Sequence, residues 1–473
     1  MKVSVESLGI LKKAEFEVGD LTIICGGNNT GKTYATYALY GFLKFWHEGY
    51  EYDFIENEDI DKLLKDGMVQ IDIENHIEKL SGIFNDASAI YSHNLPMVFG
   101  AADNSFQSAK FIITSNWDNA KYYNMNMTAE ILGTNRKPAI SIFKELGKGY
   151  IVLTLHVKVE DEDLNMAVVH SLRAAINMFI YEMVFKNIFP EPFIASIERT
   201  GAATFQRELD ITRNQLLEKL GNSDKNSDIY SQLKEARYDR RYALPVKDDV
   251  DFNRSLQDVV KYDSEFIKNH LDIIKSFGSI LNGSYKVTRE GLYFVPDKGK
   301  ARLTMAESAS SVRSLLNLGI YLRHMAKPGD FLIIDEPELN LHPSNQRKMA
   351  RLLVKIVNAG VKVFITTHSD YIIKEINTLM LLKSGIKNPQ SFAKHVMEKY
   401  GYTDNEMLDF NQLKIYAARK NLVSVAESTK RKRVDTLVPL TIGEHGVEIN
   451  EMDETINTMN EIQDLLLYER TEK

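Results

Sequence analysis

The chain has 473 residues, of which 44% are apolar and 26% charged, and its formal net charge is −7. These values are ordinary for a globular protein, and the negative charge excludes a chain that binds nucleic acid by bulk positive charge. No run approaches the roughly 18 consecutive apolar residues of a membrane span, the first residues lack a signal-peptide core, and the single cysteine, Cys25, allows no internal disulfide. We therefore expect a cytoplasmic protein without a membrane partner, built of two or three domains or of one large domain with an insertion.

The first third of the chain is rich in predicted strands. Two short apolar-alternating runs within residues 3–18, split by Gly9, predict a hairpin. The apolar run 21–25 predicts a buried strand, and a helix is expected over 33–45. Further strands are expected at 68–75, 109–115, 141–143 and 150–157.

Between the strand at 21–25 and its helix lies a loop that matches the phosphate-binding pattern G-x-x-x-x-G-K-[ST]. A strand that feeds a Gly-rich turn and then a helix aims several backbone N–H groups at one point, where the helix dipole adds positive potential. We expect this loop to bind a triphosphate, with Lys32 on its β- and γ-phosphates and the Thr33 hydroxyl on Mg²⁺. A Gly-rich turn that merely ends a strand is the simpler alternative. The loop consists of Gly26, Gly27, Asn28, Asn29, Thr30, Gly31, Lys32 and Thr33.

The middle of the chain changes character. A helix is predicted over 164–189, followed by a short strand at 193–197 that ends in Glu198-Arg199-Thr200-Gly201. Residues 203–280 are charge-rich and mostly helical in pattern, but too short and irregular for a long coiled coil. We therefore expect an inserted helical subdomain here.

The second half alternates apolar strands with helices. Short strands are expected within residues 284–304, then a helix at 311–325, a strand at 331–334, a helix at 344–359 and a strand at 361–366. Fully apolar strands that alternate with helices predict a parallel sheet buried on both faces. A strand at 436–441, a short strand at 447–449 and a helix at 451–468 follow, and the basic run 430–433 is interpreted as a solvated loop rather than a nucleic-acid site.

Chemistry-bearing residues follow two of these strands. Asp335 and Glu336 come directly after Phe331–Ile334, at the strand end where open α/β sheets bind ligands. Asp335 suits the second shell of Mg²⁺, whereas Glu336 points elsewhere and suits the orientation or deprotonation of an attacking water. His368 follows the next strand and can reach a γ-phosphate as a hydrogen-bond donor. A pair of solvated acids and a structural histidine are the plain alternatives.

Small hydroxyl residues open the helix before the acidic strand. Ser308, Ser310 and Ser311 are ordinary helix caps, and they also make a phosphate-binding helix end. The two interpretations are compatible.

In this order, the pieces resemble the ABC-type ATPase head shared by SMC, RecF and OLD proteins. Asp335-Glu336-Pro337-Glu338 followed by Leu341-His342-Pro343 is similar to the acidic stretch of RecF/OLD-like ATPases, and Thr367-His368-Ser369-Asp370 is similar to their switch loop. The resemblance covers mainly residues 1–160 and 285–385. It implies an α/β P-loop head that binds ATP and Mg²⁺ and associates head to tail with a second head.

The resemblance also implies further site residues. Ser308, Ser310 and Ser311 of one head would contact the ATP held by the other, but the usual glycine is missing, so which serine contacts the phosphate stays open. Gln107 is a weak candidate for the metal-binding glutamine. Arg199 lies in a segment similar to one in such ATPases, and its plain interpretation is a salt-bridged arginine at the core edge.

Four segments follow from this comparison of motifs. We expect an N-terminal lobe of the head with the phosphate loop, a helical insertion, a C-terminal lobe of the head, and an extension that could dock a partner. Their ranges are 1–160, 161–283, 284–385 and 386–473.

Within the superfamily, the chain looks most like the stand-alone OLD-like AAA ATPases of bacterial antiphage systems such as Septu, PARIS and some retron systems. This resemblance implies an ATP-hydrolysing sensor or scaffold, a homodimer or higher homo-oligomer, that controls a separately encoded nuclease or Toprim-type effector. DNA or a phage protein is the implied trigger. A RecF-like repair ATPase that binds DNA in an ATP-dependent way is the alternative, and a transporter ATPase subunit is a third, disfavoured by the long insertion.

Overall fold

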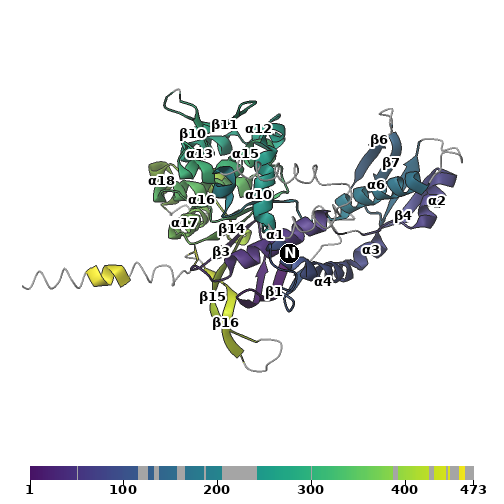
Figure 1. Ribbon diagram of the computed structural model, residues 1–473, viewed down its shortest axis with the longest axis horizontal. Coiled ribbons are helices and arrows are strands. Elements are labelled where there is room, and N and C mark those ends of the chain that lie inside the picture. Colours follow the sequence, from purple (N-terminus) through teal and green to yellow (C-terminus); the bar gives the residue numbers. More distant parts are fainter. Residues whose placement is uncertain are drawn as a thin grey trace, which may run out of the picture. The chain divides into compact units, whose positions relative to one another are not determined.

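The computed structural model (Figure 1) forms two compact units. The smaller unit comprises residues 1–2, 42–91 and 112–191, and the larger unit comprises residues 3–41, 92–111 and 192–473. These units do not coincide with the four segments expected from the sequence. Among the described residues, no helix has the length and apolar character needed to cross a bilayer. The structure describes residues 1–48, 50, 52–115, 126–132, 138–156, 166–185, 188–204, 242–299, 301–386, 392–424, 431–443, 446–447 and 458–463.

The smaller unit contains an antiparallel sheet and an aromatic core. Its four strands lie in the order β4-β8-β7-β6. The fully buried Trp46 packs its ring 4.9 Å from that of Phe185 and 4.7 Å from that of Phe189. The elements of this unit are α2 (Asn57–Asp66), β4 (Met68–Asp72), α3 (Glu74–Glu78), β6 (Met127–Leu132), β7 (Pro138–Lys144), β8 (Tyr150–Leu155) and α6 (Met166–Phe185).

The larger unit is built around a six-stranded sheet in the order β16-β15-β3-β14-β13-β9. Five neighbouring strands run parallel, and only β16 runs antiparallel to its neighbour. The parallel sheet predicted from the apolar runs is thus confirmed, and helices flank it (Figure 1). Its strands are β3 (Leu21–Cys25), β9 (Pro192–Ala195), β13 (Phe331–Asp335), β14 (Lys362–Thr367), β15 (Leu413–Ser424) and β16 (Arg431–Pro439).

Smaller sheets accompany this central sheet. One has the order β2-β1-β5, and β5 begins in the larger unit at Lys110. A second has the order β10-β11-β12, and a third pairs β17 with β18. Their strands are β1 (Lys2–Leu8), β2 (Leu11–Glu17), β5 (Lys110–Thr114), β10 (Gly283–Thr288), β11 (Gly291–Pro296), β12 (Leu303–Thr304), β17 (Ile442–Gly443) and β18 (Gly446–Val447).

Two helices, α1 and α4, begin in one unit and end in the other, while the remaining helices here belong to the larger unit. The expected helix at 311–325 is two helices that meet at Leu315. The helices are α1 (Lys32–Glu48), α4 (Leu80–Val98), α7 (Arg199–Thr204), α10 (Leu244–Arg254), α11 (Leu256–Val259), α12 (Glu265–Asn269), α13 (Leu271–Leu281), α14 (Ser310–Ser314), α15 (Leu316–His324), α16 (Pro343–Asn358), α17 (Asp370–Ile386) and α18 (Ala393–Tyr400), with 3₁₀ turns η2 (Asp404–Glu406) and η3 (Phe410–Gln412).

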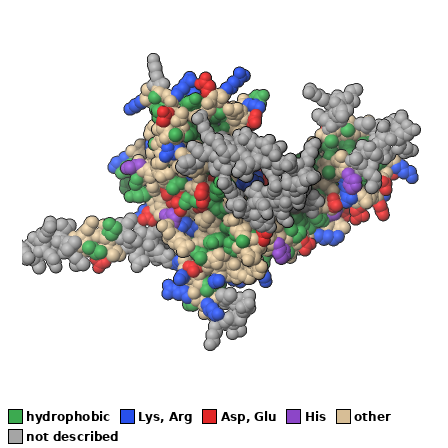
Figure 2. Space-filling model, viewed as in Figure 1, with side chains coloured by type: hydrophobic (Ala, Val, Ile, Leu, Met, Phe, Trp, Pro, Cys, Tyr) green, Lys and Arg blue, Asp and Glu red, His purple; other side chains and the backbone are tan. Residues whose placement is uncertain are grey.

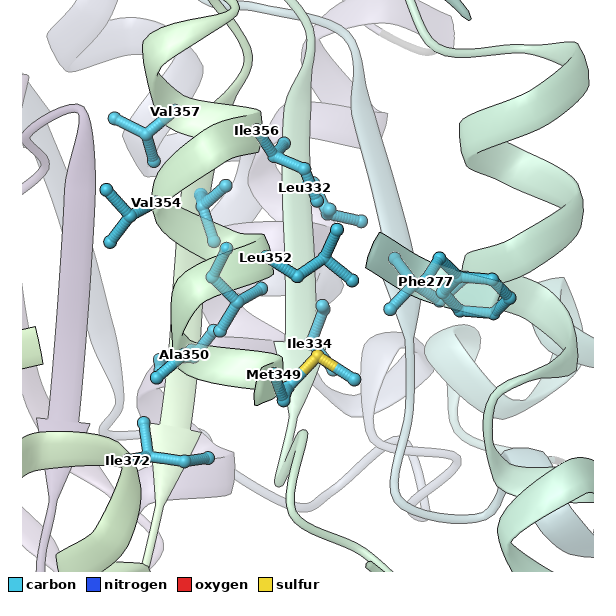
Figure 3. Close-up of a cluster of buried hydrophobic side chains, with 14 of the residues drawn as sticks. Phe277, Leu332, Ile334, Met349, Ala350, Leu352, Val354, Ile356, Val357 and Ile372 are labelled. Carbon is cyan, nitrogen blue, oxygen red and sulfur yellow. The ribbon is translucent and has the colours of Figure 1, made fainter. Parts of the chain in front are cut away.

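Helix α16 anchors the core of the larger unit. Its apolar face, which includes Met349 and Leu352, packs on Leu332 and Ile334 of β13 and toward Phe277 of α13 (Figure 3). Burial of such side chains, each worth about 1.5–3 kcal/mol, is the main force that holds the helix on the sheet. The apolar residues of α16 therefore recur at helical spacing, which places them on the one face that the sheet covers.

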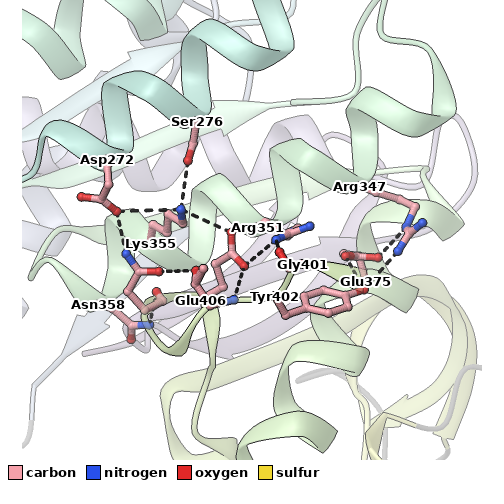
Figure 4. Close-up of polar contacts among 12 residues, drawn as sticks. Asp272, Ser276, Arg347, Arg351, Lys355, Asn358, Glu375, Gly401, Tyr402 and Glu406 are labelled. Atoms are coloured by element: carbon pink, nitrogen blue, oxygen red, sulfur yellow. Dashed lines mark hydrogen bonds and ion pairs between the residues drawn. The ribbon is translucent and has the colours of Figure 1, made fainter. Parts of the chain in front are cut away.

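The opposite face of α16 carries a polar network (Figure 4). Arg347 pairs with Glu375 of α17 at 2.6 Å, and Arg351 pairs with Glu406 of η2 at 2.7 Å. Lys355, one turn further on, lies 3.3 Å from the same Glu406. Since these positions are four residues apart, they form one row along the helix, and their ion pairs hold α17 and η2 against it.

The C-terminal segment contributes to the central sheet rather than lying apart from it. β15, which was not predicted from the sequence, pairs with β3 from Leu413 to Ala417 and with β16 from Tyr416 to Ser424. The basic run interpreted as a loop begins strand β16 at Arg431, while Lys430 lies outside the described residues. Of the expected helix at 451–468, only 458–463 is described, and it is helical.

Candidate active site

Three strand ends meet at one edge of the central sheet. In the registers of β14 with its two neighbours, Thr366 lies opposite Asp335 of β13, and Thr367 lies opposite Cys25 of β3. The phosphate loop, the two acids and His368 therefore leave the sheet side by side. This is the carboxyl edge, at which parallel sheets bind ligands.

The phosphate loop has the backbone that its glycines permit. Gly31 adopts φ +95°, and a Cβ there would lie 2.6 Å from Leu11 Cδ2. Gly26 adopts φ +146°, and a Cβ there would lie 2.6 Å from the Ala418 carbonyl oxygen. Residues 27–29 at the tip are exposed, and the Thr30 hydroxyl closes the turn on the Gly27 carbonyl at 2.9 Å. Helix α1 begins at Lys32, within the last two residues of this loop and one residue before the predicted start.

Lys32 turns back over the loop. Its ammonium donates to the carbonyl oxygens of Gly26 at 3.1 Å and Gly27 at 2.8 Å, and lies 3.1 Å from His368 Nε2. The side chain is largely buried, and burial lowers the pKa of Lys32, while the charges of Glu336, Asp335 and Glu338 oppose that shift. A cation thus stands at the point where phosphates are expected. The Thr33 side chain is exposed beside it.

Asp335 is 1% exposed, and only one of its two carboxylate oxygens has a hydrogen-bond partner among the described residues. The Thr366 hydroxyl donates to its Oδ1, whereas Oδ2 is buried without a hydrogen-bond partner among the described residues. Burial raises the pKa of this carboxyl to about 6, and the neighbouring Glu336 charge adds to the shift. An unpartnered carboxylate oxygen beside a phosphate loop fits Mg²⁺, which binds through few carboxylates and through substrate phosphates. Asp335 and Thr33 are the residues that would hold the ion.

Glu336 turns away from its neighbour because its backbone is left-handed, with φ +52°. Its Oε1 lies 2.6 Å from His368 Nε2, and this hydrogen bond lowers the pKa of Glu336. Lys32, His368 and Glu336 therefore form a continuous chain of contacts. We call these three residues the contact chain.

Glu338 fixes the loop that carries His368. Its Oε1 accepts from the His368 N–H at 2.7 Å and from the Thr367 hydroxyl at 2.8 Å. Glu338 belongs to the acidic motif at 335–338, and its position three residues after the end of β13 gives no sign of this contact in the sequence. Arg199 was also misplaced: it is buried, and its guanidinium donates to backbone carbonyls rather than lying at a core edge.

Among the described residues, no hydrogen bond joins the three serines to the contact chain. Ser308 is buried and its hydroxyl donates to the Thr304 carbonyl at 2.7 Å, while Ser310 is exposed and Ser311 partly exposed at the start of α14. Gln107 is exposed in a turn next to Phe106, whose ring lies 6.3 Å from that of Tyr34 in α1. Its neighbourhood is thus the start of α1, and a contact with metal stays a prediction.

Comparison with known proteins adds a family. A family described as AAA ATPase domain matches residues 1–373. Among solved structures, the chain is similar to an Smc head domain with an extended coiled coil bound to the C-terminal domain of ScpA from Pyrococcus furiosus (13% identity, 98% of this chain and 98% of that chain covered, TM-score 0.31). It is also similar to an SMC head domain from Thermotoga maritima (11% identity, 93% and 98% covered, TM-score 0.29) and to an Smc head bound to the C-winged helix domain of ScpA (12% identity, 93% and 98% covered, TM-score 0.31). No curated protein matches the chain in sequence.

Proposed function

The chain belongs to the AAA ATPase domain family and is an ATPase, and from this premise we propose that it is the ATP-dependent switch of a bacterial antiphage complex. In this proposal it acts in the cytoplasm as a homodimer or higher homo-oligomer and controls a separately encoded effector, a nuclease or Toprim-type protein. The observation that carries the proposal is the contact chain of Lys32, His368 and Glu336.

The contact chain connects the phosphate loop to the residues that follow β14. A charged phosphate oxygen is a stronger acceptor for an ammonium than a carbonyl oxygen. ATP is therefore expected to draw Lys32 away from Gly26 and Gly27 and to loosen its contact with His368. Binding of nucleotide to the loop would then change the position of residues 366–370. A nucleotide switch requires such a difference in contacts between its bound and free states.

The same residues supply the proposed chemistry. Bound Mg²⁺ would neutralise charge on the phosphates. The lowered pKa of Glu336 keeps its carboxylate ionised, so it can accept a hydrogen bond from the attacking water and orient it. In this proposal His368 donates a hydrogen bond to the γ-phosphate.

Plaque assays test the switch in cells. The chain is expressed with the product of the adjacent reading frame, and Lys32→Ala is compared with Lys148→Ala, a matched change at an exposed surface lysine. We expect Lys32→Ala to lose both nucleotide binding and protection, while Lys148→Ala protects like wild type. Protection by Lys32→Ala at the wild-type level would contradict the proposal.

One surface favours the second candidate, a RecF-like ATPase that binds DNA. The hairpin of β15 and β16 carries exposed Lys420, Arg431, Lys432 and Arg433, with Asp435 as an acid on the same strands. Figure 2 shows blue Lys and Arg side chains gathered on the projection at its lower edge. A local cluster of this kind can contact phosphodiester backbones even though the chain as a whole is acidic.

Filter binding with duplex DNA, with and without ATP, separates the two candidates. The triple change Arg431→Glu, Lys432→Glu and Arg433→Glu is compared with Lys62→Glu, Lys65→Glu and Lys148→Glu, three exposed positions in the smaller unit. The DNA candidate predicts tight ATP-dependent binding that weakens with salt and is lost only in the hairpin variant. Equal, weak DNA binding by the wild type, the hairpin variant and the control variant would rule out the DNA-binding candidate.

A further inference from the structure

Arg199 joins four backbone carbonyls from three separate parts of the larger unit. Its Nε donates to the Ser314 carbonyl oxygen at 2.7 Å, at the end of α14. Its Nη1 donates to the carbonyl oxygens of Ser196 at 2.7 Å and Asp335 at 2.6 Å, and its Nη2 donates to that of Glu336 at 2.8 Å. The side chain is 2% exposed, so water does not compete for these bonds.

The surroundings are built for a guanidinium group. Asp249 of α10 is buried nearby, and its charge is the first of those that oppose the lowering of the Arg199 pKa by burial. Asp249 is held in turn by the Ser196 N–H at 2.9 Å and by Asn317 at 2.6 Å. A guanidinium offers five donors in a rigid planar fork, enough for these four carbonyls, whereas an ammonium offers three donors on a flexible stem.

Glu336 is where this clamp matters for chemistry. Its φ of +52° is uncommon for a residue with a side chain and persists only when the surroundings enforce it. Its N–H donates to the Thr366 carbonyl at 3.2 Å, and its carbonyl accepts from Arg199. The two bonds hold the peptide groups on either side of its Cα, and this conformation places the carboxylate on His368.

We propose that Arg199 is a positioning residue that holds Asp335 and Glu336 in their productive backbone conformation and thereby sets the rate of ATP hydrolysis. This inference rests on the role proposed above for Glu336. Arg199 acts through Glu336 and has no contact with nucleotide in this account. Its bond to Ser314, together with that of the Ser314 hydroxyl to the Leu339 carbonyl at 3.0 Å, also ties α14 to the acidic loop.

Steady-state ATPase kinetics and equilibrium ATP binding of Arg199→Lys and Arg199→Ala test the proposal. Because small displacements of a catalytic group are costly, we expect Arg199→Lys to lower kcat about tenfold or more and to leave ATP affinity within about threefold. Guanidinium ion should restore part of the kcat of Arg199→Ala, whereas urea of the same shape should not. Arg173→Lys, at a guanidinium that donates to the side chains of Asp53 and Asn57, is the matched control with unchanged kcat.

Wild-type kcat in Arg199→Lys would overturn the inference, and so would an equal loss of kcat and ATP affinity. If Arg199→Ala does not fold, the kcat and affinity of Arg199→Lys decide alone. The proposed function fails on a separate result. It fails if the wild-type protein does not hydrolyse ATP, or if Lys32→Ala hydrolyses ATP as the wild type does. Wild-type hydrolysis with an unimpaired Arg199→Lys would leave the proposed function intact and reject only the role of Arg199.

Discussion

At the scale of single residues, two adjacent carboxyl groups have opposite environments. Burial raises the pKa of Asp335 to about 6, while the hydrogen bond from His368 lowers the pKa of Glu336. Neighbouring acids whose pKa values are pushed apart are typical of sites that divide two roles between them. The division fits the roles proposed for Asp335, as a metal ligand, and for Glu336, as the residue that orients water.

The raised pKa of Asp335 gives a prediction for pH dependence. As the pH falls through about 6, Asp335 takes up a proton, and the neutral acid no longer suits Mg²⁺. We expect kcat/KM for ATP to fall on this acid limb. Because the metal competes with the proton, the limb should move to lower pH when the Mg²⁺ concentration is raised. Rate profiles at two Mg²⁺ concentrations measure this, and a limb that does not respond to Mg²⁺ would assign the titration to another group.

Removing the carboxylate of Glu336 should separate binding from chemistry. We expect Glu336→Gln to bind ATP but to hydrolyse it at least about 10²-fold more slowly, the usual contribution of a positioned base. Glu290→Gln, at an exposed turn, serves as the matched control. A Glu336→Gln variant with wild-type turnover would remove this residue from the reaction.

Replacing His368 tests the middle of the contact chain. His368→Ala should lower kcat about tenfold or more while ATP affinity changes less, because its contact is expected with the γ-phosphate as charge develops there. Turnover and binding of a fluorescent ATP analogue give the two numbers. Unchanged turnover would count against the assigned role.

At the scale of elements, strands that are buried on both faces could be predicted from the sequence, because their apolar residues follow one another without alternation. β3 and β13, which are apolar apart from Thr22 and Asp335, were predicted within one residue of their observed bounds. The phosphate loop and the two acids could be placed as well, because they lie at the ends of these strands. β15 was missed because Lys414, Arg419 and Lys420 interrupt its apolar pattern, although Ile415–Ala418 are buried. Its partner β3 lies almost four hundred residues earlier in the chain (at Leu21–Cys25, against Leu413–Ala417), a pairing that spacing does not reveal.

The roles of Arg199 and Glu338 lay beyond the sequence for a different reason. Both act on backbone atoms of distant segments, such as the Asp335 carbonyl and the His368 N–H. Backbone groups carry no residue identity, so no pairing of side-chain types announces the contact. Only the folded structure shows that Arg199 bonds the backbone at residues 335 and 336 and that Glu338 bonds the backbone at His368.

The core under α16 gives a prediction at this scale. Leu352 is fully buried between the helix and the sheet, so Leu352→Ala should lower the free energy of unfolding by about 2–5 kcal/mol. Lys348→Ala on the exposed side of the same helix should change it by no more than about 0.5 kcal/mol. Denaturant unfolding followed by fluorescence compares them. Equal stability of the two variants would mean that α16 does not carry the core.

At the scale of the whole molecule, the resemblance to ABC-type heads predicts association that depends on ATP. Light scattering after size exclusion should show the Glu336→Gln protein as a dimer or larger assembly with ATP and Mg²⁺. Lys32→Ala, which lacks the ammonium proposed to bind phosphate, should stay in the smaller form under the same conditions. Identical masses for both variants with and without ATP would contradict the head-to-tail proposal.

The central claim is that one magnesium-bound triphosphate gathers Lys32, Asp335, Glu336 and His368. An experimental structure of the Glu336→Gln protein with ATP and Mg²⁺ tests it most directly. We expect phosphates cradled by the backbone of residues 26–33, Lys32 drawn from the Gly26 and Gly27 carbonyls onto them, and the metal between Thr33 and Asp335. Nucleotide bound at any other place, with Lys32 still on its own loop, would contradict it.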